Sequence, residues 1–243
     1  MSPTLTWATA VRILRQLAHD PRTIVMMLLA PPLLLFLMRY VFDDERFFDE
    51  IAPKLIAIFP FLVMFLVTSI ATLRERRSGT LERLMTLPIG KLDLLVGYAV
   101  AFTLCAVVQV SLVLPVAFAL GLDIAGSVPA LAGIALMDAV LGVAFGLFLS
   151  AFAHTEFQAV QFLPAFVLPQ ILLCGLFTPR DSMNVVLEWI SNVLPLSYAV
   201  SAIDGATQST EFTSDVWGDL AVVAGFIAAA LVLGAVTLRR RTR

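Results

Sequence analysis

The sequence predicts an all-α integral membrane protein with six transmembrane helices, on three observations. Hydrophobic residues make up 60% of the 243 residues and charged residues 14%, whereas soluble domains average about 45–50% and about 25%. The apolar residues fall into six long runs, and a helix needs about 20 such residues to cross the hydrocarbon core. The runs are continuous rather than alternating, which favours helices over barrel strands. We therefore expect one transmembrane domain over residues 1–243 and no sizeable soluble domain.

The distribution of Lys and Arg predicts the orientation of the spans. With both termini in the cytoplasm, twelve of the 16 basic residues lie inside and four outside, as the positive-inside rule requires. The six apolar runs cover residues 23–41, 51–73, 94–121, 128–153, 157–177 and 217–238. The inside residues are Arg12, Arg15, Arg22, Arg74, Arg76, Arg77, Arg83, Lys91, Arg239, Arg240, Arg241 and Arg243, and the outside residues are Arg39, Arg46, Lys54 and Arg180.

Two segments outside the spans show helical periodicity. Residues 1–22 place Trp7, Leu14 and Leu17 on one face and Arg15 on the other, which predicts an interfacial helix on the inner leaflet; a frayed tail is the alternative. Residues 179–216 are too apolar for a solvated loop, and we expect short interfacial or re-entrant helices there that cap the external side. Their apolar stripe comprises Val186, Leu187, Ile190, Val193 and Leu194 and ends before Pro195.

The cytoplasmic loop of residues 74–93 contains the sequence "RERRSGTLERLMTLPIG". Thr80 is an acceptable N-cap, and Pro88 disfavours helix at the residue before it. A short amphipathic helix is therefore expected, with Leu84 and Met85 on one face and Glu82 and Arg83 on another. A connector that merely obeys the positive-inside rule is the alternative, and composition does not decide between them.

Four stretches in this order resemble the permease subunits of type 2 ATP-binding cassette (ABC) exporters, including bacterial drug-efflux and polysaccharide-export permeases. The resemblance covers essentially the whole chain, although Asn184 stands where many members of the family have proline. The stretches are "LAHDPRTIVMMLLAPPLLLFL", "RERRSGTLERLMTLPIGKLDLLVGY", "LCGLFTPRDSMNVVLEWISNVLPLSYAVSAI" and "LVLGAVTLRRRTR".

The apolar runs and the segments between them, together with the resemblance, divide the single domain into an interfacial helix, three groups of spans, a coupling loop and an external segment. The implied segments are residues 1–22, spans one and two at 23–73, the coupling loop at 74–93, spans three to five at 94–178, the external segment at 179–216, and span six with its tail at 217–243. In the family the loop helix is a coupling helix that docks on a separate ATP-binding subunit. By the same likeness, the partner-binding residues are expected to be Thr80, Glu82, Arg83, Leu84 and Met85.

Inside the membrane, the sequence offers one carboxylate deep in a span. Asp138 is either a functional site or an inter-helix hydrogen-bonding group, and Gln109 in the third span is a plausible partner for it. Small residues at Gly142, Gly146 and Ser150 recur every four positions, a spacing that predicts close helix packing. Prolines in the first and fifth spans predict bends that free backbone groups.

The sequence carries no recognisable catalytic or cofactor chemistry. It contains no G-x-x-x-x-G-K-[ST] phosphate loop, so ATP and Mg²⁺ are expected on a partner and no cofactor on this chain. The two histidines have no cluster of metal-ligand spacing, and a net charge of -2 does not favour nucleic-acid binding.

We thus expect a permease subunit of the bacterial inner membrane that exports a hydrophobic or amphipathic compound, most plausibly a drug or antibiotic. A second permease chain, identical or related, and the lipid bilayer complete its expected partners. Three alternatives stay open: export of lipid or polysaccharide by the same mechanism, ion-coupled transport through Asp138, and a membrane scaffold or sensor that transports nothing.

Overall fold

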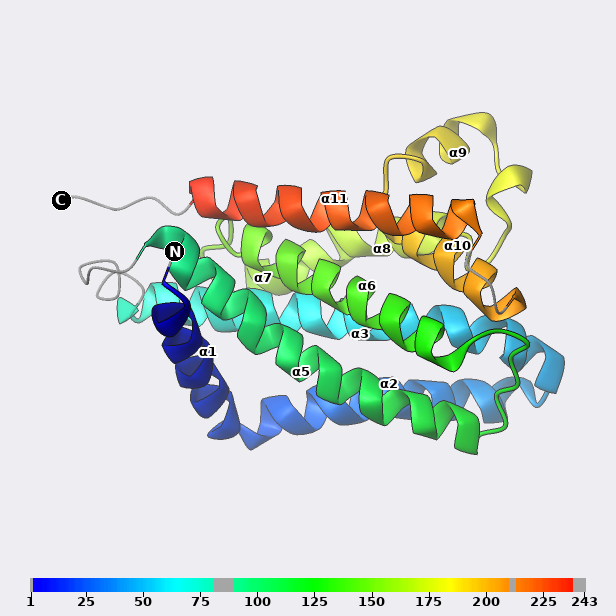
Figure 1. Ribbon diagram of the computed structural model, residues 1–243, viewed down its shortest axis with the longest axis horizontal. Coiled ribbons are helices and arrows are strands. Elements are labelled where there is room, and N and C mark those ends of the chain that lie inside the picture. Colours follow the sequence, from blue (N-terminus) through cyan, green and yellow to red (C-terminus); the bar gives the residue numbers. More distant parts are fainter. Residues whose placement is uncertain (1, 81–89, 210–212, 238–243) are drawn as a thin grey trace.

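The computed structural model describes residues 2–80, 90–209 and 213–237, and every regular element in these ranges is a helix (Figure 1). Six of the helical segments are long and apolar enough to cross a membrane, which confirms the predicted fold class. The six are α2 (Pro21–Phe42), α3 (Glu45–Arg77), α5 (Lys91–Ala119), α6 (Val128–Leu149), the segment Glu156–Leu173, and α11 (Ser214–Thr237).

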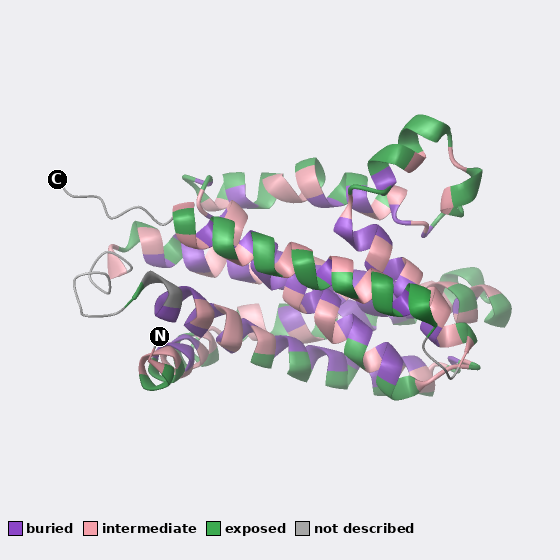
Figure 2. Ribbon diagram, turned by 45° about the horizontal axis from the view of Figure 1, so that its top comes forward, coloured by how far each residue is buried: buried purple, intermediate pink, exposed green. Residues whose placement is uncertain are grey.

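The centre of the bundle is the pair α3 and α6, and the other spans surround it (Figure 2). In the most apolar 18-residue window of each span, 61% of the residues of α3 and 67% of those of α6 are buried. The corresponding share is 17% for α2, for Glu156–Leu173 and for α11. The spans at the edge therefore leave most of their apolar side chains to lipid or to another protein chain.

Helix α3 begins six residues earlier than its apolar run, because its N-terminus is capped. The Asp44 carboxylate accepts hydrogen bonds from the backbone N–H groups of Arg46 and Phe47 at 3.0 and 3.3 Å, which satisfies donors that a helix start leaves free. The charged stretch 45–50, which the apolar runs left in an external connection, consequently forms the start of a 33-residue helix.

The fifth span is divided by a π-helical turn. Its parts are α7 (Glu156–Phe162), the π turn Leu163–Val167 and α8 (Leu168–Leu173). Pro164 lies inside the turn and Pro169 follows it, and proline removes the N–H that a regular helix needs. The bend that these prolines predicted is thus a local widening of the helix.

Two shorter helices, α9 (Val185–Ser191) and α10 (Pro195–Gln208), lie at the end of the bundle opposite α1 (Pro3–Ala18) and the C-terminal end of α11 (Figure 1). They meet at 88°, because Pro195 starts a new helix. Helix α10 packs on the bundle through buried Leu196, Val200 and Ile203, whereas α9 is held mainly at its end, where the buried Ser191 hydroxyl donates to the Leu173 carbonyl of α8 at 2.8 Å.

The expected apolar stripe on α9 does not pack on the bundle. Val186 and Val193 are 65% and 66% exposed, and Figure 1 shows α9 projecting outward. The reason is local: apolar residues surround the short helix, so no single face is left to direct it inward. Asn184 caps α9, since its side chain accepts a hydrogen bond from the N–H of Val186 at 3.0 Å.

Candidate functional site

The predicted coupling loop can be placed only where it leaves α3. Glu82, Arg83, Leu84 and Met85 lie outside the described residues. Thr80 is described, and its hydroxyl is 2.9 Å from the hydroxyl of Ser78, just after the end of α3. The structure therefore describes only how the loop is attached to the helical bundle, which is through the last turn of α3.

Three consecutive residues at the end of α3, Arg74, Glu75 and Arg76, make contacts with different helices, and we call them the α3 anchor. Glu75 forms a bidentate ion pair with Arg12 of α1, with N–O distances of 2.7 and 3.2 Å. Arg12 also donates to the Tyr98 hydroxyl of α5 at 3.3 Å. Glu75 is 9% exposed, and a charge this buried requires such a partner.

The two arginines of the α3 anchor point to other helices. Arg74 donates from Nε and Nη2 to the Glu156 carboxylate of α7 at 2.9 and 3.2 Å. Arg76 donates to the carbonyl of Ser150 at the end of α6. The last turn of α3 is thus joined to α1, α6 and α7, so displacement of the loop at residue 80 would move several helices together.

Asp20 extends this network to the start of α2. It is the N-cap, and its carboxylate accepts from the Thr23 hydroxyl and backbone N–H at 2.7 and 3.2 Å. These hydrogen bonds, followed by the charges of Arg74 and Arg22, hold the pKa of Asp20 below its ordinary value.

Helix α1 is also fixed to the start of α5. A Cβ on Gly97 would lie 2.7 Å from Cβ of Thr9, so only glycine allows the two helices to approach so closely. The backbone N–H of Ser2 donates to Asp93 at 2.9 Å. Whatever moves the segment before α5 therefore also acts on α1.

The two intramembrane candidates, Asp138 and Gln109, form no hydrogen bond with each other in the described structure. Asp138 on α6 is fully buried, and neither carboxylate oxygen has a hydrogen-bond partner among the residues that the structure describes. Gln109 does not donate to it. Instead, Gln109 Nε2 donates to the carbonyl oxygen of Met27 on α2 at 2.8 Å.

A proline explains the contact of Gln109. In a regular helix the carbonyl of Met27 would accept from the N–H of residue 31, but Pro31 has none. The Gln109 amide replaces that donor from the neighbouring helix. Both signals were in the sequence, but nothing in it aligned position 109 of one span with position 27 of another.

The small-residue stripe faces α3. A Cβ on Gly142 would lie 2.2 Å from the carbonyl oxygen of Phe61, and one on Gly146 would lie 2.7 Å from that of Phe65. The hydroxyl of Ser150 donates to the Leu147 carbonyl at 2.7 Å within α6. The two glycines thus allow the backbones of α3 and α6 to touch.

The sequence did not predict the partners of the α3 anchor. The charges 74–77 were assigned to a loop, because their density suggested an aqueous connection, but they form the last turn of a helix. A usable signal was the alternation of signs in Arg-Glu-Arg-Arg, since a positive-inside loop does not need a glutamate.

The family model described as ABC-2 type transporter matches residues 4–206 of the chain. Among curated proteins, the probable multidrug ABC transporter permease YbhR of Escherichia coli strain K12 is 30% identical over 156 residues, 64% of this chain and 42% of YbhR. The inner membrane transport permease YhhJ of the same strain is 30% identical over 143 residues, 58% of this chain and 38% of YhhJ.

A eukaryotic relative matches over a similar length. ABC transporter G family member 20 of Dictyostelium discoideum is 24% identical over 161 residues, which cover 66% of this chain and 22% of that protein. The chain therefore matches less than half the length of each of these curated relatives.

Proposed function

Because the chain belongs to the ABC-2 type transporter family, we propose that it is the permease subunit of an ATP-driven exporter in a bacterial inner membrane. The proposed cargo is a hydrophobic or amphipathic compound, foremost a drug or antibiotic, as the description of the relative YbhR as a probable multidrug permease suggests. In the proposed orientation both termini are cytoplasmic, which agrees with α1 and the C-terminal end of α11 lying at the same end of the bundle (Figure 1).

The observation that carries the proposal is the α3 anchor. A subunit that drives transport from outside the membrane must act on the bundle through a rigid attachment. The contacts of Arg74, Glu75 and Arg76 supply one, because they join the residue before the loop to three other helices. Without these contacts, movement of the loop would displace only the end of α3 and would not be transmitted to the other helices.

The proposed partner is a separate ATP-binding subunit, which holds ATP and Mg²⁺ and docks on the segment containing Thr80, Glu82, Arg83, Leu84 and Met85. Apolar side chains such as Leu84 and Met85 would supply the buried contact, and the charges would fix the orientation of docking. A second permease chain, identical or related, would complete the pathway and cover part of the exposed spans.

The test is compound-stimulated ATP hydrolysis in proteoliposomes that contain this chain and its proposed ATP-binding subunit. We expect the double substitution Glu82→Lys, Leu84→Asp to abolish both subunit association and stimulated hydrolysis. Arg77→Gln, at an exposed position that precedes the loop, is the matched control and should retain both. Unchanged association in the double variant would show that the loop is only a connector. Replacing drugs by lipid-linked glycans in the same assay distinguishes lipid or polysaccharide export.

Asp138 favours a second candidate function, ion-coupled transport. A fully buried carboxylate without a partner in the described part of the chain is costly to maintain and is a functional hypothesis in a membrane span. Transport that follows an imposed proton gradient without the ATP-binding subunit, and that Asp138→Asn abolishes, would support this candidate. Transport that requires ATP and survives Asp138→Asn would exclude it and favour a structural role. Absence of transport under either energy source would favour a scaffold or sensor.

A further inference from the structure

A cavity of about 620 Å³ lies between α1, α2, α3 and α5. This volume is within the range of about 300–1,000 Å³ that is usual for small-molecule sites. Its walls are mostly apolar, and neither Asp138 nor Gln109 lines it. The apolar lining comprises Met26, Ala30, Leu34, Leu62, Leu66 and Ile70, among others.

The cavity is bordered on one side by α2, which contributes Met26, Ala30 and Leu34 to its lining. Pro31 and Pro32 interrupt the hydrogen bonding of α2, and the Gln109 contact holds Met27 against α5. Helix α1 then crosses the open end and contributes Ile13, Gln16 and Leu17 to the lining. The space is thus enclosed by helices on several sides rather than being a flat lipid-facing surface.

The depth of the cavity matches one leaflet of a bilayer. Its lining on α3 extends from Leu62 to Glu75, a rise of thirteen residues at 1.5 Å each, or about 20 Å including the charged mouth. Half of a hydrocarbon core of about 30 Å is about 15 Å. A hydrocarbon chain that entered at the α1 end would therefore be accommodated to about the middle of the membrane.

The mouth of the cavity is charged, and most of its charges are already paired. Glu75 is neutralised by Arg12, and Arg74 is shared by Glu156 and Asp20. Arg22 also lines the mouth and is exposed, and it forms no ion pair with any residue in the described ranges. Arg22 is thus the cation available to a ligand at this mouth.

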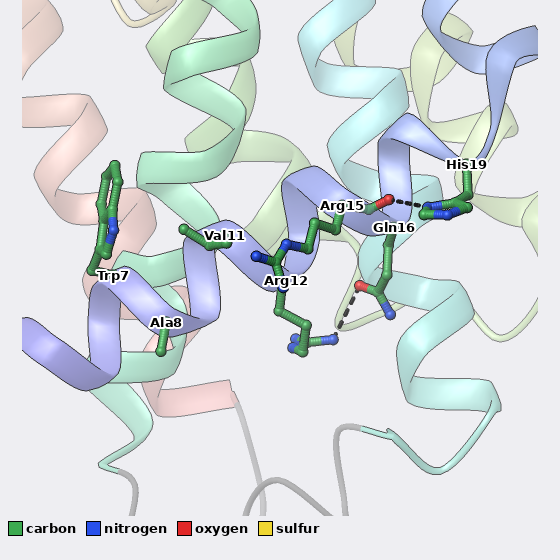
Figure 3. A pocket seen from close by; sticks show the side chains of 7 residues that line it. All are labelled: Trp7, Ala8, Val11, Arg12, Arg15, Gln16 and His19. Carbon is green, nitrogen blue, oxygen red and sulfur yellow. Dashed lines mark hydrogen bonds between the residues drawn. The ribbon is translucent and has the colours of Figure 1, made fainter.

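Arg15, on the outer face of α1, adds to this positive charge. Figure 3 shows Arg12, Arg15 and His19 along that face, with Trp7 near its start. Arg15 is exposed and its side chain makes no ion pair in the part of the chain that the structure describes. Exposed arginines beside a membrane surface attract anionic lipids, so the surroundings of the mouth complement a negative head group.

We propose that this cavity binds an anionic amphiphile of the cytoplasmic leaflet. One hydrocarbon chain lies between α2 and α3, and the acidic head group contacts Arg22 at the mouth. The assignment to that leaflet rests on the orientation proposed above. Binding itself requires neither the ATP-binding subunit nor export of the amphiphile.

The experiment is photolabelling of the purified permease, without an ATP-binding subunit, in nanodiscs of neutral phosphatidylcholine. The probe is lysophosphatidylglycerol with a diazirine at the end of its acyl chain, and labelled peptides are mapped by mass spectrometry. We expect saturable labelling near Leu34 and Leu62, which unlabelled lysophosphatidylglycerol displaces. Unsaturable labelling spread evenly over the exposed faces of α5 and α11 would overturn the proposal.

Variants separate the cavity from general lipid contact. Ala71→Phe and, as an independent second variant, Ala30→Phe place a ring in the cavity and should reduce saturable labelling at least ten-fold. Ala229→Phe, the same change at an exposed position of α11, should leave it unchanged. Near-native gel filtration and circular dichroism identify the variants that are folded. Unchanged labelling in both cavity variants contradicts the proposal.

The head group is tested separately. Arg22→Gln should weaken binding of the lysophosphatidylglycerol probe about five-fold, the equivalent of one arginine near an anionic surface. It should leave the corresponding lysophosphatidylcholine probe unaffected. Equal labelling by both probes would contradict an anionic ligand, and cross-linking between two permease chains through Leu34 or Leu62 would identify a second copy as the occupant. The ATPase assay above contains neither probe, so the two proposals can fail independently.

Discussion

The α3–α6 pair and the edge helix α2 are held in place by different physics. Between α3 and α6, glycines let one backbone touch the other, and most side chains of both helices are buried. Helix α2 has few buried side chains, and polar contacts fix it instead, at Asp20 near its start and at the Met27 carbonyl in its interior.

The difference shows which part of the molecule can adapt to a ligand. Close backbone packing has little tolerance, since protein interiors are packed as densely as organic crystals. A helix held by a few polar contacts can shift without loss of a large buried area. The proposed amphiphile site lies against α2, the adaptable region, whereas the α3 anchor extends from the rigid one.

The largest expected effect is that of Gly142→Ala. The added Cβ would lie 2.2 Å from the carbonyl oxygen of Phe61, and backbone atoms cannot move aside as a side chain can. We expect a loss of about 3 kcal/mol in the free energy of unfolding, at the upper end of overpacking effects. Denaturation monitored by circular dichroism in detergent measures it.

Gly133→Ala is the matched control on the same helix. A Cβ at position 133 would have no atom within 4 Å in the described structure, so the substitution should be neutral or stabilise α6 by up to about 1 kcal/mol. Equal effects of the two substitutions would show that α3 and α6 are not in backbone contact at Gly142.

The next largest effect concerns the Arg12–Glu75 pair of the α3 anchor. Arg12→Gln and Glu75→Gln should each lower the free energy of unfolding by about 2 kcal/mol. The two side chains are 28% and 11% exposed, so the strength of the ion pair should lie between that of a buried pair and that of a surface pair. In a double-mutant cycle the coupling free energy should exceed about 1 kcal/mol.

The Arg74–Glu156 pair is the internal comparison for that cycle. Its side chains are 53% and 46% exposed, so its coupling should stay below about 1 kcal/mol. A coupling at Arg12–Glu75 no larger than this would mean that α1 is held mainly by its packing at Gly97.

The sequence predicted the elements of this fold better than their partners. Six continuous apolar runs determine six spans, because the bilayer sets both length and composition. The Asp44 cap extended α3 beyond its apolar run, and α9 kept its apolar side chains outside the bundle. Neither outcome follows from apolar periodicity: the extension of α3 depends on a local hydrogen-bonding cap by the Asp44 side chain, and the short α9 carries apolar residues on several sides rather than on one face.

For the candidate sites, too, the sequence predicted the residues better than their contacts. The glycines of α6, Gln109 and Pro31 were each recognisable, but the contact between Gln109 and α2 required the relative rotation and depth of two helices. One-dimensional patterns do not contain these quantities. The partners of Glu75 were hidden for a further reason, since the charges looked like part of a loop.

A smaller effect is expected for Gln109→Leu, which leaves the Met27 carbonyl without its donor. The cost should be about 1 kcal/mol, in line with measured inter-helix hydrogen bonds in membranes. Pro31→Ala in the same chain should recover most of it, because alanine supplies the missing backbone N–H. Thermal unfolding of the single and double variants tests this, and a double variant as unstable as the sum of the singles would contradict the proline explanation.

The smallest effect is the pH dependence of the α2 N-cap. Because the Thr23 hydrogen bonds lower the pKa of Asp20 in the folded protein from its ordinary value of 3.8, the cap stabilises α2 fully above that value. The contribution is lost as the pH falls through the lowered folded pKa.

Carbon-detected NMR titration of the Asp20 carboxyl should give a pKa below 3.8 in the native protein, and Thr23→Val should move it upward by removing the hydroxyl donor. An unchanged pKa in that variant would show that the charges of Arg74 and Arg22, rather than the Thr23 hydroxyl, lower the pKa of Asp20. The change in overall stability should be small in either case, because Asp20 lies at the surface and solvent screens its charge. The Asp20–Thr23 cap therefore determines where α2 begins and contributes little to the overall stability of the bundle, in line with the few polar contacts that hold this edge helix.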